Sequence, residues 1–166
     1  MTAAGLRRAG RADGASGTIV SVNISRKKGQ AKIPVAEAQI IAGEGIREDA
    51  HRGFGHRQVS LLMIESIEEQ RARLSGGPET GVGPGAYAEN LTTRGIDLKG
   101  LEVGAGLIIK GAGGTIRLRV SQIGKECHTK CAIYKLVGDC IMPGLGIFCE
   151  VLEGGRVRAG DRIERL

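Results

Sequence analysis

The sequence predicts a mainly β protein, a β-barrel with one or a few short helices at its periphery. Three observations carry this prediction: several short runs are rich in β-branched residues, the chain has 28 glycines among 166 residues, and only one segment has a clear helical pattern. Short strands separated by glycine-rich turns are typical of all-β folds. A chain of this length can bury a core without disulfides or a structural metal, so a single domain is expected.

The N-terminal third is predicted to contain a flexible tail and three extended segments. Residues 1–16 mix Gly, Ala and Arg without a period, so we expect a flexible tail before one domain over residues 17–166. The run GTIVSVNIS at 17–25 is the first strand, and IPVAEAQIIAGEGI at 33–46 is a second extended segment beyond a basic turn. A polar loop, REDAHRGFGHRQ, then leads to VSLLMI at 59–64, which is short enough for a buried strand.

The one clear helix is expected in ESIEEQRARLSGG, residues 65–77. Ser66 and Glu69 have the spacing of a capping box, Ile67 and Leu74 lie seven apart on one face, and two glycines end the run. The other residues are mostly charged, so the helix should lie on the surface.

The C-terminal half is predicted to be almost entirely strands. AYAENLTT at 86–93 is a short strand, residues 101–124 form two or three strands around a glycine-rich hairpin, and residues 146–166 form two strands joined at two glycines. The run GVGPGA at 81–86 fits a dinucleotide-binding fingerprint in letters only, because no strand precedes it and a proline interrupts it. A Rossmann fold is therefore not expected.

Composition excludes several classes of protein. No apolar run is long enough for a signal peptide or a membrane span, and four cysteines are too few for a disulfide-rich secreted scaffold, so we expect a cytoplasmic protein without a membrane partner. The net charge of +6 is moderate, and two Phe and two Tyr offer little base stacking. These features argue against a nucleic-acid partner and favour a small anionic ligand.

All four cysteines lie in KECHTKCAIYKLVGDCIMPGLGIFCE, residues 125–150. Zinc is one alternative, but the intervals C-x3-C, C-x8-C and C-x8-C differ from the pairs typical of structural zinc sites. Cys149 lies in an apolar strand pattern and is expected in the core. Cys127 lies between Lys125 and Lys130, and cationic neighbours favour the nucleophilic thiolate, so it is the first candidate for a chemical role.

The run QIGKECHTKCAIYKLVGDCIMPGLGIFCEVLEGGRVRAGDRI strongly resembles the C-terminal half of a MOSC domain, the module named for the C-terminal part of molybdenum cofactor sulfurase. GTIVSVNIS, EDAHRGFGHRQVSLLMIESIE and PGAYAENLTTRGI resemble the same family in the same order. Together these blocks cover about residues 17–166, so the chain resembles a stand-alone bacterial MOSC protein.

The resemblance implies a β-rich barrel and a cysteine that ligates molybdenum or carries a persulfide. Cys127 matches this position best, and Cys131 is close enough to be the alternative. The molybdenum cofactor is a pyranopterin with a phosphate, which Arg57, Arg94 or Lys125 could receive.

Two further blocks imply the remaining cofactor-binding candidates. Asn90 is preferred because an amide can both donate to and accept from a pterin edge. The other candidates, each with a structural or surface role as its alternative, are His51, His56, Arg57, Gln58, Ser60, Glu89, Thr92 and Thr93.

Three functions follow from these alternatives. The first is a carrier that binds the cofactor or a persulfide and serves cofactor-maturation enzymes. The second is a molybdenum-dependent oxidoreductase that reduces N-hydroxylated compounds. The third is a structural β-barrel with inert or zinc-binding cysteines. The sequence shows no aminotransferase-like domain, so sulfur or electrons would come from a partner, a sulfur donor or a reductase.

Overall fold

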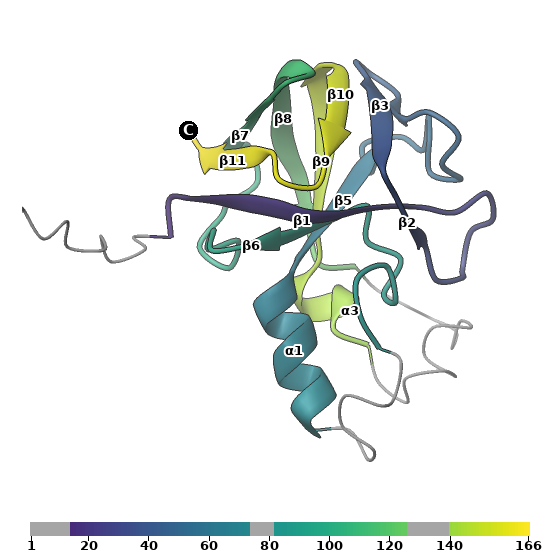
Figure 1. The fold of residues 1–166 in the computed structure, drawn as a ribbon, viewed down its shortest axis with the longest axis vertical. Helices are drawn as coiled ribbons and strands as arrows, with labels where there is room; N and C mark the ends of the chain where they lie inside the picture. The colour runs from purple at the N-terminus through teal and green to yellow at the C-terminus, as the bar shows by residue number, and fades with distance from the viewer. Residues whose placement is uncertain (1–13, 74–81, 126–139) are drawn as a thin grey trace, which may run out of the picture.

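A closed ring of seven strands forms the centre of the computed structural model, which describes residues 14–73, 82–125 and 140–166 (Figure 1). In ring order the strands are β1 (Ser16–Ile24), β11 (Arg162–Arg165), β7 (Gly106–Gly111), β8 (Gly114–Ile123), β9 (Ile147–Glu153), β5 (Val59–Met63) and β6 (Leu91–Arg94). The ring closes because β1 pairs with β6 along one edge and with β11 along the other. The predicted β-barrel is therefore confirmed.

Four further strands of the described residues lie outside the ring. Strand β2 (Ile33–Val35) extends the sheet beside β1, and a second sheet has the order β10 (Gly155–Arg158), β3 (Glu37–Ile41) and β4 (Gly45–Ile46). Figure 1 shows β3 and β10 beside one end of the barrel, with the two helices at the opposite end. Within the described residues, no helix is long and apolar enough to span a membrane.

Strand alternation separates the barrel interior from the face that carries the candidate site. On β5, Val59 and Leu61 join the interior core, and their β9 partners Cys149 and Ile147 do the same. Residues between them point the other way, because successive side chains of a strand face opposite sides. Phe148 consequently packs in a second apolar cluster, outside the barrel wall and against the helices.

Helix α1 (Ile64–Arg73) follows β5 without an intervening loop. The predicted capping box is wrong, because Ser66 lies inside the first turn and is buried rather than preceding the helix. The strand runs directly into the helix, so no residue is left to serve as a separate cap. Ile67 is buried and Glu69 is exposed, as expected for a surface helix, and Leu74 lies outside the described residues.

Helix α3 (Met142–Leu145) forms a single turn before β9. Its Met142 packs in the second apolar cluster together with Phe148 and with Ile67 of α1. Both helices therefore cover the same outer face of the barrel, where Figure 1 places them together.

Several predicted segments differ in extent. Residues 33–46 divide into three short strands, and residues 146–166 divide into three rather than two, because a turn at Gly160 separates β10 from β11. In 86–93 only the last three residues belong to a strand, since the chain before Leu91 turns back on itself. Strand β1 begins at Ser16, the last residue of the predicted tail, and residues 1–13 lie outside the described part.

Candidate functional site

A cleft lies on the outer face of the barrel, between strands β5 and β9 and the loops that surround them. Its floor is made by Ser60 of β5 and Phe148 of β9, which are register partners. The remaining lining comes from four separate segments of the chain, so only the fold brings these residues together. They are His51, Arg57, Tyr87, Ala88, Asn90, Lys125 and Met142.

Asn90 is held in place by the barrel wall. Its side-chain oxygen accepts from the Ser60 N–H at 3.0 Å and from the Ser60 hydroxyl at 3.2 Å, and its amide donates to the Asn23 carbonyl at 3.2 Å. A side-chain amide has two N–H groups, and the second has no partner among the described residues. Asn90 lines the cleft and keeps one side-chain N–H without a described partner, while its oxygen is already occupied.

Two cationic side chains, Arg57 and Lys125, line the cleft. The Arg57 guanidinium lies 4.8 Å from the centre of the Phe54 ring and 5.8 Å from that of Phe148, and Lys28 lies over the same Phe54 ring at 3.9 Å. Cation–aromatic contacts orient these side chains but do not neutralise their charge. In the described ranges, no carboxylate forms an ion pair with Arg57, Lys28 or Lys125.

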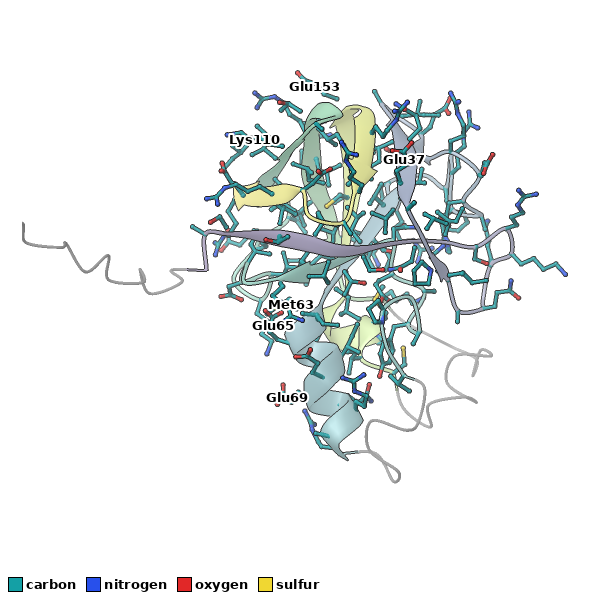
Figure 2. All side chains as sticks on the ribbon, in the orientation of Figure 1. Glu37, Met63, Glu65, Glu69, Lys110 and Glu153 are labelled. Carbon is teal, nitrogen blue, oxygen red and sulfur yellow. The ribbon has the colours of Figure 1, made fainter. Side chains whose placement is uncertain are left out.

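Several exposed cations on the barrel strands are paired with carboxylates. Lys110 lies 3.3 Å from Glu164, and Arg117 lies 3.3 Å from Glu153. Figure 2 shows Lys110 and Glu153 at the barrel end away from helix α1. Arg57 and Lys125 border the cleft without a described carboxylate partner, and such charge favours an anionic ligand.

A buried ion pair supports one wall of the cleft. The Lys32 ammonium lies 2.7 Å from one oxygen of Asp49, and both side chains are almost completely buried. The same ammonium lies 3.1 Å from Nδ1 of His51, which lines the cleft. Asp49 also accepts the backbone N–H groups of Ser25 and His51 at 3.0 and 3.1 Å, so one carboxylate joins strand β1, the basic turn and the polar loop.

The protonation of this pair follows from its surroundings. Burial alone would raise the pKa of Asp49, but the nearby His51 ring, the hydrogen bond from Lys32 and the lysine charge hold that pKa well below its usual value. Burial lowers the pKa of Lys32, and the adjacent Asp49 opposes this change. We interpret the pair as a carboxylate and an ammonium in direct contact.

Glu89, Thr92 and Thr93 lie behind the cleft rather than in it. The Glu89 carboxylate accepts from the Gly85 N–H, from the Tyr87 N–H at 3.2 Å and from the Thr92 hydroxyl at 3.1 Å. Burial raises the pKa of Glu89 to about 7, although these hydrogen bonds act in the opposite direction. The Thr93 hydroxyl is buried without a hydrogen-bond partner among the described residues. None of the three lines the cleft.

Three other predicted residues also lie elsewhere. Arg94 is exposed at the end of β6, 3.4 Å from Glu68 of α1. Gln58 is buried, and its side chain bonds the Gly43 and Gly55 carbonyls and the Val151 N–H. His56 is exposed and contacts Gln122 at 2.7 Å. Of the predicted binding residues, the cleft brings together His51, Arg57, Ser60, Asn90 and Lys125.

Cys140 and Cys149 are the cysteines that lie within the described residues. Cys149 is fully buried inside the barrel, and burial raises the pKa of its thiol well above the usual range, which confirms a core position. Cys140 is half-buried beside the second apolar cluster. Cys127 and Cys131, the predicted reactive thiols, lie outside the described residues. Within the described residues, no three His, Cys, Asp or Glu side chains could hold a metal ion.

A family model for the MOSC domain matches residues 48–164, well over half of the chain. This chain belongs to the MOSC family. The matched range contains most of the cleft, including Arg57, Asn90 and Lys125. The match begins at residue 48, so the buried ammonium of Lys32 is contributed by a segment that precedes it.

Solved structures agree with this MOSC fold. The YuaD protein from Bacillus subtilis is similar with a TM-score of 0.72 and 22% identity, covering 90% of this chain and 95% of that one. YiiM from Escherichia coli is similar with a TM-score of 0.64 and 19% identity, covering 90% of this chain and 69% of that one. YiiM from Geobacillus stearothermophilus is similar with a TM-score of 0.65 and 20% identity, covering 90% of this chain and 75% of that one. Comparison with curated protein sequences finds no match.

Sequence reasoning missed the Lys32–Asp49 pair of this MOSC domain. The sequence places Lys32 in a basic turn and Asp49 in a polar loop. The one available signal is weak: Lys32 directly precedes Ile33-Pro34-Val35, and an apolar run after a lysine is compatible with either burial or exposure. The pairing spans 17 residues and depends on how two loops fold against β1.

Proposed function

We propose that this MOSC protein binds a molybdenum cofactor, or carries sulfur for its maturation, through a reactive cysteine. One observation carries the proposal: Arg57 and Lys125, without a described carboxylate partner, border the same cleft as a hydrogen-bond donor, the Asn90 amide. This combination suits a ligand that has both an anionic end and a polar ring edge.

The chemistry of the lining supports a phosphate-bearing pterin. Arg57 and Lys125 can donate charge-assisted hydrogen bonds to a phosphate. The free N–H of Asn90 can donate to an acceptor on the pterin edge, while Phe148, Met142 and Tyr87 provide apolar walls for a flat ring. Bound molybdenum would supply redox chemistry and a preference for sulfur ligands, to which a thiolate belongs.

Cys127 is the proposed thiol because of its covalent distance from the cleft. Two peptide units separate it from Lys125, and consecutive Cα atoms are about 3.8 Å apart, so its Cα lies within about 8 Å of the Lys125 Cα. The corresponding bound for Cys131, six residues away, is about 23 Å. Cys127 is therefore the better candidate for the molybdenum ligand or persulfide carrier, and Cys131 remains the alternative.

The test is metal and pterin analysis of protein purified from a host that makes molybdenum cofactor. The intact protein should contain molybdenum and pterin, and Cys127→Ser should lose both. Arg57→Met should bind the cofactor at least tenfold more weakly, because it removes a phosphate donor. Cys149→Ala is the matched control for loss of a thiol: provided that it folds, it should retain the cofactor, since its side chain faces the barrel interior.

Other outcomes would indicate a different reactive cysteine or a different function. Cofactor retained by Cys127→Ser and lost by Cys131→Ser moves the role to Cys131. Loaded protein that reduces N-hydroxylated compounds with an added reductase establishes the oxidoreductase alternative. If every variant contains zinc and none contains molybdenum, pterin or persulfide, the proposal fails and the structural alternative takes its place.

A further inference from the structure

The buried Lys32–Asp49 pair is more than a link between loops, because it contacts a cleft residue through the ammonium. Lys32 Nζ lies 2.7 Å from Asp49 and 3.1 Å from Nδ1 of His51. A purely structural link would need only the backbone contacts of Asp49 with Ser25 and His51. A buried ion pair is costly to desolvate, and an apolar pair of similar volume often serves stability as well.

The hydrogen-bond inventory determines which nitrogen of His51 carries the proton. An ammonium only donates, so Nδ1 at 3.1 Å from Lys32 must be an acceptor. Nδ1 lies 3.7 Å from the second Asp49 oxygen, beyond hydrogen-bond distance, and that oxygen already accepts the His51 backbone N–H. The neutral ring therefore carries its proton on Nε2.

We infer that Lys32 and Asp49 are positioning residues that hold His51 in one tautomer, so that its Nε2–H is a fixed hydrogen-bond donor for an anionic ligand in the cleft. His51 is partly exposed, with 28% of its side chain accessible, and it borders the cleft. Because Nδ1 faces the buried pair, Nε2 is the ring nitrogen that remains to contact a ligand. The Phe54 ring packs edge-on against the His51 ring, with the two ring centroids 5.8 Å apart, and this contact limits the rotation of the His51 ring.

The charges around His51 are consistent with this role. Lys32 and Asp49 face its Nδ1, while Arg57 and Lys125 border the same cleft. An anion bound by Arg57 and Lys125 would then have the Nε2–H of His51 as a further donor in the same cleft. The inference rests on the proposed function for the identity of that anion, but the tautomer is a property of the unliganded protein.

The test is NMR of histidine labelled with 15N, because the ring shifts distinguish a protonated nitrogen from an unprotonated one. At pH 8 the intact protein should show Nδ1 of His51 unprotonated and Nε2 protonated. In Lys32→Met, Nδ1 should become protonated, since Asp49 is then the nearest acceptor. Lys27→Met is the matched control, because Lys27 is exposed and its loss should leave His51 unchanged. His56, exposed beside Gln122, is the internal reference.

A protonated Nδ1 in the intact protein would overturn the inference, as would a Lys32→Met variant with an unchanged His51. If Lys32→Met does not fold, the intact protein still decides, since Lys32 ammonium protons must show a contact with the His51 ring. Inorganic phosphate is the ligand probe: it should shift the His51 Nε2–H resonance. Phosphate that binds in an Arg57-dependent manner without moving this resonance overturns the ligand role of His51 alone. If no phosphate binds, the phosphate site of the proposed function fails, and the tautomer result stands separately.

Discussion

Replacing Asp49 with alanine should destabilise the folded protein by about 3–5 kcal/mol, the usual loss when one partner of a buried ion pair is removed. The carboxylate has no exposed surface and lies 2.7 Å from the Lys32 ammonium, whose side chain is 1% exposed. Alanine would leave that ammonium buried without an opposite charge. It would also remove the acceptor of the Ser25 and His51 N–H groups.

A double-mutant cycle measured by urea unfolding at pH 7 separates the pair from its surroundings. Asp49→Ala and Lys32→Met should each be costly, while the double variant should lose at least about 2 kcal/mol less than their sum. Glu44→Ala is the matched control, because the Glu44–Arg52 pair has the same 2.7 Å separation but each side chain is 44% exposed. Its loss should stay below about 1 kcal/mol. Additive losses in the cycle, or an Asp49→Ala effect no larger than that of Glu44→Ala, would refute the reasoning.

Three further predictions concern residues around the cleft. The pKa of Glu89 is raised by burial from 4.5 to about 7, so the unfolded chain loses this proton first as the pH rises. Stability should therefore fall by about 3 kcal/mol between pH 4.5 and pH 7, and Glu89→Gln should lack this slope in urea unfolding at a series of pH values. Gly85→Ala should destabilise more than Gly43→Ala in thermal unfolding: both glycines have positive φ, but only at Gly85 would the new methyl group meet a backbone carbonyl, that of Lys32. Equal losses would contradict that contact. Cys149 should resist alkylation in native buffer and react after unfolding, as mapped by mass spectrometry, because burial raises the pKa of its thiol and excludes the reagent. Rapid native labelling would show that the thiol is accessible.

The class of fold could be predicted from local patterns because strand periodicity is a property of neighbouring residues. In IFCEVL, every second residue, Ile147, Cys149 and Val151, belongs to the barrel core. A strand in a barrel wall needs this alternation because successive side chains face the interior and the exterior in turn. The capping box failed for the converse reason. Ser66 and Glu69 have suitable spacing, but the direct passage from β5 into α1 depends on how the strand ends in three dimensions.

The candidate site was only partly predictable. His51, Arg57, Ser60, Asn90 and Lys125 were selected from the sequence, and the structure places them around one cleft. Gln58 and Arg94 belonged to the same sequence blocks, yet they lie elsewhere. Gln58 precedes β5 and its side chain bonds the backbone of neighbouring segments, while Arg94 lies at the far end of β6 beside Glu68. Membership of one sequence block therefore does not bring every polar residue to one ligand.

The sequence by itself determined the β-rich class, the MOSC membership and the polar residue types available for an anionic ligand. These depend on composition, periodicity and the order of short motifs along the chain. Only the tertiary structure decided which polar groups meet. Lys32 and Asp49 became a buried pair, the Asn90 oxygen was occupied by Ser60, and Arg57 and Lys125 were left without a described carboxylate. The physical reason is that burial and pairing depend on contacts between segments distant in the chain, and closure of the barrel sets those contacts.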